Sequence, residues 1–512
     1  MTMSSPSLSS QIRDLTEEAL RDLVPGPGRD MVSQIQAKLA TPLTVTVAGG
    51  VSSGKSTLVN ALLGQRIAAV DAGECTRVVT EFRYGVQERA EVLGTDGTVT
   101  VLPLERGRMP EHLGRPTDQI TSVVVHLSNE LLRDVAVVDT PGLNTVTEAN
   151  EDTTASFLGV SGREGHQTAD AVGRADALVF LLPLLRQADA EVLRGFAKLF
   201  GGSGLSAASS IAVLSKIDRL GRDADPLQSA RPIAERMAAE LKGVVSAVMP
   251  VIGLLAETAH AAVFTEADAR ALVAIAAVDD ALDREDMLLS AEDFLRTEVT
   301  DVDVATRRRL LAMLDIHGLG VAIAAVDQGA TSAAGILQQL AARSGFDELR
   351  AAVIGRFAGQ ADLFKAHAAL SDLRRASYLR TDSANTRVLR SLRSPLERIE
   401  LDPAMHRLRM LEVAHAVAAG ELALPDDLLD DVVALTTSQD PLSVVGSISG
   451  RSRETASAGA ARWASWGNDA RRSPDESRLA RIVKEAYEVM WTELVGSTGG
   501  HDRSRELRIG DR

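Results

Sequence analysis

The chain has 512 residues, of which 45% are apolar and 24% are charged, so its composition is that of an ordinary folded protein and excludes a fibrous or wholly disordered chain. At roughly 150 residues per domain, this length predicts about three structural units. The formal net charge of −15 argues against a nucleic-acid-binding protein, because such proteins neutralise phosphates with a basic surface. The single cysteine, Cys75, cannot form an internal disulfide, and the N-terminus lacks the apolar stretch of a secretory signal, so we expect a cytoplasmic location.

The start of the chain has a helical pattern. Apolar residues recur at helical spacing in 12–23 and again in 31–39, and the break PGPG at 25–28 separates the two segments. They predict two short amphipathic helices. The longest apolar runs of the chain, 178–185 and 244–256, are shorter than the ~20 residues that a transmembrane helix needs, so no membrane-spanning segment is predicted.

From residue 43 the pattern changes to short β-rich runs, and helical stretches lie between the later ones. Alternating strands and helices predict an α/β layer with a mostly parallel sheet. The turn GTDGT separates the third and fourth of these runs. The predicted strands are 43–50, 78–85, 89–93, 98–103, 122–127, 134–139, 176–182 and 210–216, with a further strand-like run at 244–251.

Strand signals nearly vanish after about residue 257, so the second half of the chain is predicted to be helical. Trp463 and Trp466 are spaced to share one helix face and are expected to pack between helices. The closing helix is predicted from apolar residues that fall on one face, as in a helix bundle. These residues are Leu479, Ile482, Val483, Ala486, Val489, Met490 and Leu494.

The string GGVSSGKST at 49–57 follows the first predicted strand and precedes a helix-like run. It fits the pattern GxxxxGK[ST] of a phosphate-binding P-loop, with Lys55 and Ser56 as its last two positions. In such a loop, backbone amides surround the phosphates, the lysine supplies positive charge and the serine hydroxyl ligates Mg²⁺. The predicted nucleotide-binding residues here are Gly49, Gly50, Val51, Ser52, Ser53, Gly54, Lys55, Ser56 and Thr57.

The string DTPG at 139–142 follows the predicted strand that contains VAVV. The end of a strand is where a phosphate sensor belongs in an α/β sheet. Asp139 is expected to hold Mg²⁺ through water, and the amide of Gly142 is expected to bind the γ-phosphate and couple it to the following loop.

The string SKID at 215–218 follows the predicted strand SIAVL. The Asp218 carboxylate can accept two hydrogen bonds from guanine N1 and the exocyclic 2-amino group, a pair of donors that adenine lacks. The aliphatic stem of Lys216 can lie along the base. The third motif therefore predicts a guanine nucleotide, GTP or GDP.

These three motifs, in this order and followed by a long helical region, resemble those of a bacterial dynamin-like GTPase. In particular, the chain resembles the isoniazid-inducible dynamin-like proteins of mycobacteria and their actinobacterial relatives, and this resemblance covers most of the chain. The further stretches that carry it are ECTRVVTEFRYG, LLAMLDIHGLGVAI, SGFDELRAAVIGRFAGQADLFKAHAALSDL and EAYEVMWTEL.

The resemblance implies an α/β P-loop GTPase domain of dynamin type and an all-α helical bundle that serves as a neck or stalk. We expect the N-terminal helices to pack with the C-terminal ones, since neither set buries its apolar face alone. The expected divisions are neck helices at 1–40, the GTPase domain at 41–358, a helical neck with a membrane-proximal tip at 359–496, and a flexible tail at 497–512.

The resemblance also implies a function. The protein would bind GTP and hydrolyse it slowly to GDP and phosphate, with Mg²⁺ as the cofactor, and G-domain dimerisation would couple this reaction to membrane binding and remodelling. The expected partners are anionic membrane lipids and either a second copy of the chain, joined through the G domains, or a second dynamin-like protein; no nucleic acid is expected. The expected location is the cytoplasm, with peripheral association at the inner face of the plasma membrane.

By resemblance, Thr76 matches the switch I threonine that closes on Mg²⁺ and the γ-phosphate, with Thr80 as the alternative. Ser52 matches a residue that dynamins link to a charge-compensating monovalent cation. The expected catalytic residues are Ser52, Lys55, Thr76 and Gly142, and the expected metal-binding residues are Ser56, Thr76 and Asp139.

The chain departs from these relatives at three points. Val51 stands where dynamins have glutamine, and Leu143 stands where Ras-like enzymes have a water-orienting glutamine, so intrinsic hydrolysis should be slow unless switch I or a second G domain completes the site. Gly253 and Leu254 stand at the family's Ser-Ala guanine loop and match it poorly. The first two departures also suit a rival function, a GTP-binding scaffold or regulatory partner of a second dynamin-like protein with negligible hydrolysis of its own.

Two segments compete as the membrane contact. Residues 437–453 form a turn-rich apolar loop that ends in arginines, suited to insertion beside anionic headgroups. Residues 387–398 form a basic amphipathic stripe. For both segments the alternative is a connecting loop or a solvated face of the bundle.

Overall fold

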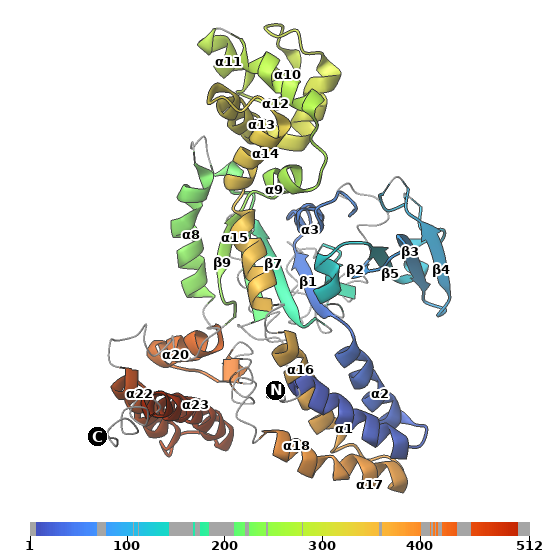
Figure 1. Ribbon diagram of the computed structural model, residues 1–512, viewed down its shortest axis with the longest axis vertical. Coiled ribbons are helices and arrows are strands. Elements are labelled where there is room, and N and C mark those ends of the chain that lie inside the picture. Colours follow the sequence, from blue (N-terminus) through green and yellow to red (C-terminus); the bar gives the residue numbers. More distant parts are fainter. Residues whose placement is uncertain are drawn as a thin grey trace, which may run out of the picture.

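The computed structural model describes residues 7–68, 78–105, 107–110, 112–142, 167–168, 171, 175–183, 209–220, 225–241, 244–278, 280–357, 361–400, 410, 413–414, 416–417, 422–437 and 452–499. Figure 1 shows a central sheet with one helical group at one end of the long axis and two helical groups at the other end.

Nine strands among the described residues form one sheet, in the order β4-β3-β5-β2-β6-β1-β7-β8-β9. β1 pairs in parallel with β6 and β7, and β8 pairs in parallel with β7 and β9. The prediction of a mostly parallel sheet is confirmed, and these inner strands are nearly continuous apolar runs because both faces are covered. The strands are β1 (Leu43–Gly49), β2 (Thr80–Tyr84), β3 (Arg89–Gly94), β4 (Val99–Pro103), β5 (Ile120–Leu127), β6 (Val135–Asp139), β7 (Ala177–Pro183), β8 (Ser210–Ser215) and β9 (Val248–Val251).

The part of the sheet beyond β6 is mixed. β2 runs antiparallel to β6 but parallel to β5, and β3 runs antiparallel to both β4 and β5. The β3–β4 hairpin turns at Gly97, whose φ of +78° favours glycine, and the Asp96 carboxylate accepts a hydrogen bond from Thr98 N at 3.0 Å. The runs of residues predicted these strands but not their directions.

Several helices pack with the sheet. α3 follows β1 and packs against α9, whereas α8 packs against β9. The helices that lie with the sheet are α3 (Lys55–Leu63), α4 (Leu131–Asp134), α8 (Pro226–Glu240), α9 (Gly253–His260) and α15 (Phe346–Ala351), together with the 3₁₀ turns η2 (Thr117–Gln119) and η4 (Ile217–Arg219) and the π-helical segment η5 (Ala352–Phe357).

A helical group lies above α9 in Figure 1, and its hydrophobic core continues into residues of β8, α8 and α9. Its helices are α10 (Glu266–Ala276), α11 (Ala281–Met287), α12 (Ala291–Arg296), α13 (Val304–Asp327) and α14 (Ala333–Ala342). A capping box between Thr265 and Asp268 starts α10, and Arg309 of α13 forms an ion pair with Asp268 at 2.9 Å. This pair ties the start of α10 to the middle of the group.

One described helix, α13, is long and apolar enough to cross a membrane, with a mean hydropathy of 1.7 over its best window. Half of that window is buried inside the protein, as expected for a helix in a protein core. The sequence prediction missed this window because charged residues interrupt the apolar run. One of them, Asp315, has φ 53° and ψ 179°, so α13 consists of two helical pieces that meet at this residue.

At the other end of the molecule, α1 (Leu8–Asp22) and α2 (Pro27–Ala40) pack against α16 (Ala361–Ala376) and α17 (Ser383–Ser391), and α18 (Arg393–Glu400) contacts α16 and α17. Asn385 of α17 joins neck helices that are far apart in sequence. Its amide donates to Val24 O, between α1 and α2, at 3.1 Å, and its oxygen accepts from Val24 N at 2.9 Å. This packing supports the proposal that 1–40 and the first part of 359–496 form one neck.

The third helical group consists of α20 (Asp426–Thr437), α22 (Ser452–Gly467) and α23 (Pro474–Gly499), with a separate hydrophobic core. Trp463 is fully buried there, donates from Nε1 to Asp431 Oδ2 at 3.0 Å and packs edge-on against Trp466. The predicted packing of both tryptophans between helices is confirmed. α23 extends through Gly499, three residues beyond the predicted end of the neck at 496, because nothing before the Gly499-Gly500 pair ends the helix.

The two predicted membrane segments differ in what the structure describes. In 387–398, the side chains of Leu389, Leu392 and Leu396 are buried in the core of the neck and cannot insert into a bilayer in this conformation. The Arg393 guanidinium stacks on Tyr378, with 4.0 Å between its central carbon and the ring centroid. In the other segment, residues 438–451 lie outside the described residues.

Candidate nucleotide-binding site

The P-loop joins the carboxyl end of β1, in the interior of the sheet, to the N-terminus of α3. Its turn requires glycine at two points. Gly49 has φ +150°, and a Cβ there would lie 2.6 Å from Leu181 O; Gly54 has φ +97° and directly precedes α3. The loop therefore places backbone amides at a helix N-terminus, an arrangement that binds anions such as phosphate.

The ammonium group of Lys55 lies inside this loop. It donates hydrogen bonds to Gly50 O at 2.9 Å and to Gly49 O at 3.2 Å. Burial lowers the pKa of Lys55, and the nearby Asp139 carboxylate opposes this effect. The positive charge is thus held where the loop would surround phosphate oxygens.

Asp139 ends β6, which pairs with β1, and so faces the first turn of α3. Ser56 Oγ donates to Asp139 Oδ2 at 2.7 Å. Burial raises the pKa of Asp139 to about 6, while the Ser56 hydrogen bond and the Lys55 charge oppose this rise. Its second oxygen, Oδ1, is buried and has no hydrogen-bond partner among the described residues. A hydroxyl and a carboxylate with an unused oxygen are hard ligands, and this set fits Mg²⁺.

The DTPG loop lies directly against the P-loop. A Cβ on Gly142 would lie 2.8 Å from Val51 Cα, so only glycine allows this approach. Thr140 Oγ1 donates to Val47 O at 2.9 Å and anchors the loop to β1. The structure therefore brings Gly142 next to the P-loop residues that the sequence predicts.

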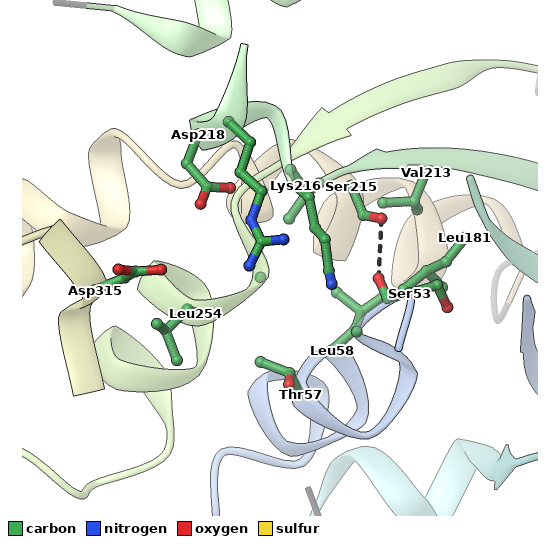
Figure 2. Close-up of a pocket in the computed structure, with 14 residues that line it drawn as sticks. Ser53, Thr57, Leu58, Leu181, Val213, Ser215, Lys216, Asp218, Leu254 and Asp315 are labelled. Atoms are coloured by element: carbon green, nitrogen blue, oxygen red, sulfur yellow. Dashed lines mark hydrogen bonds between the residues drawn. The ribbon is translucent and has the colours of Figure 1, made fainter. Parts of the chain in front are cut away.

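The SKID motif lines a cavity of about 170 Å³ together with the P-loop. Ser215 Oγ donates to Ser53 O at 2.9 Å and joins the end of β8 to the P-loop. Lys216 has φ +58° and ψ 33°, and Asp218 follows in a 3₁₀ turn. Figure 2 shows Lys216 extending from this turn toward Ser53, with Asp218 at the rim of the same cavity.

The cavity has further walls that the three motifs do not contain. Gly253 and Leu254, at the start of α9, line it, although they match the guanine loop of the resembled family poorly. Arg219 and Asp315 also line it, although neither is among the site residues predicted from the sequence. Arg219 adjoins SKID and could have been included. Asp315 comes from α13, and no local pattern connects it with the motifs.

Of the predicted switch residues, only Thr80 lies in the described part of the chain. Thr76 and Leu143 lie outside the described residues. Thr80, the alternative to Thr76, begins β2 opposite Asp139 of β6, and its hydroxyl donates to Val78 O at 3.4 Å. The roles of Thr76 and Thr80 therefore stay predictions.

Comparison with known proteins gives concordant matches. A profile of the Dynamin family matches residues 45–194. Over 352 residues the chain is 36% identical to the isoniazid-induced protein IniC of Mycobacterium tuberculosis (strain H37Rv), covering 67% of this chain and 69% of that protein. Over 119 residues it is 29% identical to the bacterial dynamin-like protein of Nostoc punctiforme, covering 20% of this chain and 17% of that protein.

Among solved structures, a chain from an oligomerised bacterial dynamin pair aligns with 100% of this chain and 80% of its own length at 13% identity, but its TM-score of 0.31 is too low for a structural argument. The match to IniC spans two thirds of both proteins, and the family profile covers the P-loop and DTPG motifs. The predicted fold class, a GTPase domain of dynamin type with a mostly parallel sheet and a large helical region, is thereby confirmed. The chain belongs to the dynamin family.

Proposed function

We propose that the protein binds GTP and hydrolyses it slowly, and that dimerisation of its G domains couples this cycle to binding and remodelling of the inner face of the plasma membrane. Membership of the dynamin family supports GTPase chemistry in general. The observation that carries the proposal is the meeting of the P-loop, Asp139 and Asp218 at the same end of the sheet, with the P-loop and Asp218 on one cavity.

The phosphate half of the site follows from Lys55 and Ser56. GTP phosphates would replace the loop carbonyls as partners of the Lys55 ammonium, which already sits among the backbone groups of the loop. Ser56 and Asp139 would hold Mg²⁺, the serine directly and the carboxylate through water. Bound there, Mg²⁺ would neutralise phosphate charge during transfer to water.

The base half follows from Asp218 and Lys216. The Asp218 carboxylate would accept hydrogen bonds from guanine, and the Lys216 stem would cover the face of the base. Burial lowers the pKa of Lys216, the Arg219 charge lowers it further, and Asp218 opposes both effects. The site would thus select guanine over adenine by hydrogen-bond donors rather than by size.

Hydrolysis would be slow in the isolated chain because no glutamine stands at Val51 or Leu143 to orient the attacking water. Ser52, at φ +57° in the P-loop, together with Thr76 and Gly142, would complete the catalytic site. A second G domain bound across the nucleotide would supply what one chain lacks. The partner would be a second copy of this chain or another dynamin-like protein.

The membrane part of the proposal concerns anionic lipids and peripheral attachment from the cytoplasmic side. Its support is twofold: the resemblance to dynamin-like proteins implies a helical neck that acts on a lipid surface, and α1 and α2 pack with α16 and α17 as a neck would. Of the two proposed contacts we favour 437–453, because the leucines of 387–398 are buried in the core of the neck.

A second function has one observation in its favour. The Val51 side chain is 57% exposed in the P-loop, at the position where a catalytic glutamine would stand. This suits a GTP-binding scaffold or regulatory partner that hydrolyses GTP negligibly and pairs with a second dynamin-like protein.

The test is GTP turnover by the purified protein across a concentration series, with and without liposomes of anionic lipid, and with Lys55→Ala as the blank. We expect turnover per molecule to rise with protein concentration and with liposomes, because dimerisation completes the site. Turnover that stays at the blank level despite measurable GTP binding would contradict the enzymatic proposal and favour the scaffold function.

A further inference from the structure

We propose that Asp315 is a second guanine-recognition residue, whose carboxylate accepts the 2-amino hydrogen of guanine that Asp218 leaves unpaired. This inference rests on the proposed binding of a guanine nucleotide in the cavity beside the P-loop. It adds to that site a specificity-determining residue from α13, an element outside the three nucleotide-binding motifs.

The first observation is the conformation of Asp315. Its φ of 53° and ψ of 179° lie in a region that side chains other than glycine rarely adopt, and they break α13 between two helical pieces. Glycine would allow the same break without strain, and Gly318 and Gly320 stand close by in the same helix. Asp315 is therefore a non-glycine residue at a position whose backbone conformation favours glycine, and its carboxylate is present despite this strain.

The second observation is the position of that carboxylate. Asp315 lines the cavity that also contains Asp218 and Leu254, and Figure 2 shows Asp315 on the wall formed by α13, across the cavity from Lys216. Among the described residues its carboxylate makes one hydrogen bond, from Ile316 N to Oδ1 at 2.7 Å. Oδ2 is thus available to a ligand in the cavity.

The pKa of His317 agrees with the carboxylates of Asp218 and Asp315 lying at the same end of the cavity. Burial lowers the pKa of His317, and the charges of Asp218, Asp315 and Asp225 all oppose this effect, so these carboxylates act on the same ring. Two negative groups repel each other unless positive charge or hydrogen-bond donors lie between them. The side chains of Lys216 and Arg219 supply positive charge at this cavity, and a guanine base would supply donors.

The chemistry of guanine requires a further acceptor. Its Watson–Crick edge presents N1–H and one hydrogen of the 2-amino group, and a single carboxylate can accept both. The second 2-amino hydrogen points away from that carboxylate, and a donor left unpaired in a partly buried site reduces affinity. Asp315, on a different wall from Asp218, can accept it. Asp218 and Asp315 together would then hold all three donors of the base.

The experiment compares binding of GDP and inosine diphosphate, which lacks the 2-amino group, by isothermal titration calorimetry. The variants are Asp315→Asn, which keeps the acceptor for Ile316 N but loses the charge, and Asp315→Gly, which keeps the backbone break without strain. We expect both variants to bind GDP about tenfold more weakly and inosine diphosphate within twofold of the parent, so that the preference for GDP falls about tenfold.

Asp327→Asn is the matched control, because Asp327 ends the same helix and pairs with Arg284 away from the cavity. Equal losses for both nucleotides in the Asp315 variants, or an unchanged preference, would overturn the inference; thermal unfolding of Asp315→Gly shows whether the fold is intact. If the parent prefers GDP to inosine diphosphate and adenosine diphosphate, and the Asp315 variants keep this preference, then the guanine site stands and only the role of Asp315 is refuted. A parent that binds no GDP refutes the proposed function as well.

Discussion

Positive φ angles occur at four described residues other than glycine, and three of them, Ser52, Lys216 and Asp315, belong to the nucleotide site. Each such conformation costs on the order of 1–3 kcal/mol. Ser52 lies in the P-loop, and the other two line the base cavity. At the scale of the residue, strain is therefore concentrated where the chain would meet the phosphates and the base.

Asp139 gives a prediction at the same scale. Because burial raises its pKa from 3.8 to about 6, the folded protein without nucleotide holds a proton between these two pH values that the unfolded chain releases. Stability contributed by this group therefore falls as the pH rises from about 4 to 6. Above pH 6 the buried charge costs about 3 kcal/mol, since each pKa unit corresponds to about 1.4 kcal/mol.

We expect Asp139→Asn to be more stable than the parent at pH 7.5 and equally stable near pH 4, measured by urea unfolding without nucleotide or Mg²⁺. Asp118→Asn, at an exposed aspartate before β5, controls for the loss of one negative charge. A variant that is less stable than the parent at pH 7.5 would show that the hydrogen bond from Ser56 outweighs the cost of burial.

At the scale of the element, α3 and α9 are joined by the buried side chain of Asn60. Its Nδ2 donates to Glu257 Oε1 of α9 at 2.6 Å and to Ala68 O at 3.1 Å, and its Oδ1 accepts from the amides of Ile67 and Ala68 at 2.9 and 2.7 Å. Arg66 approaches Glu257 at 3.4 Å. This network fixes the chain at residue 68, shortly before the segment that contains Thr76.

Asn60→Ala should lower the free energy of unfolding by about 3–5 kcal/mol, because it leaves two amides, a carbonyl and a buried carboxylate without this partner. Asn129→Ala is the matched control: Asn129 is half-buried and makes two hydrogen bonds, to Leu63 O and from Leu131 N, and its loss should cost about 1 kcal/mol. Urea unfolding measures both. Equal losses in the two variants would mean that burial of the network contributes nothing extra.

The elements also show what can be predicted from sequence and what cannot. Lys55, Asp139 and Asp218 were predictable because each stands in a short contiguous motif at the end of an apolar strand, and parallel strands bring those ends together. Leu254 stands at the guanine loop of the resembled family but matches its residues poorly, so its sequence carried little weight. Asp315 comes from a helix whose sequence carries no nucleotide signature, and only the tertiary fold places it on the cavity.

Two further features had no local signal. An amphipathic pattern shows that 387–398 has an apolar face but not whether protein or lipid covers it, and here the neck core covers it. Aspartate does not by itself end a helix, so the break of α13 at Asp315 could not be read from the residues around it.

At the scale of the whole molecule, the neck meets the sheet around one buried carboxylate. Asp176, just before β7, accepts a hydrogen bond from Thr44 N at 2.9 Å. Lys365 of α16 approaches Asp176 Oδ2 at 3.9 Å and donates to Lys38 O, at the end of α2, at 2.8 Å. Burial lowers the pKa of Lys365, and Asp176 opposes this effect. One lysine thus links two neck helices to the sheet that carries the nucleotide site.

If the neck transmits the nucleotide state to the membrane, weakening this junction should separate the two activities. We expect Lys365→Met to lower the free energy of unfolding by about 2–4 kcal/mol. A buried carboxylate loses a cationic neighbour, and Lys38 O and Thr41 Oγ1, at the end of α2, lose a donor. GDP affinity, measured by calorimetry, should stay within twofold, because the substitution lies away from the P-loop. Stimulation of GTP turnover by anionic liposomes should fall at least fivefold.

Lys484→Met provides the control, because Lys484 of α23 forms an ion pair with Glu488 at 3.0 Å on a partly exposed face, where such pairs contribute little. It should change neither stability nor turnover measurably. Full liposome stimulation in Lys365→Met, with normal GDP binding, would contradict transmission through this junction and move the coupling to other contacts between α16 and the N-terminal helices. A loss of GDP binding together with stimulation would instead show that the junction supports the G domain itself, since the sheet then depends on the neck for its own fold.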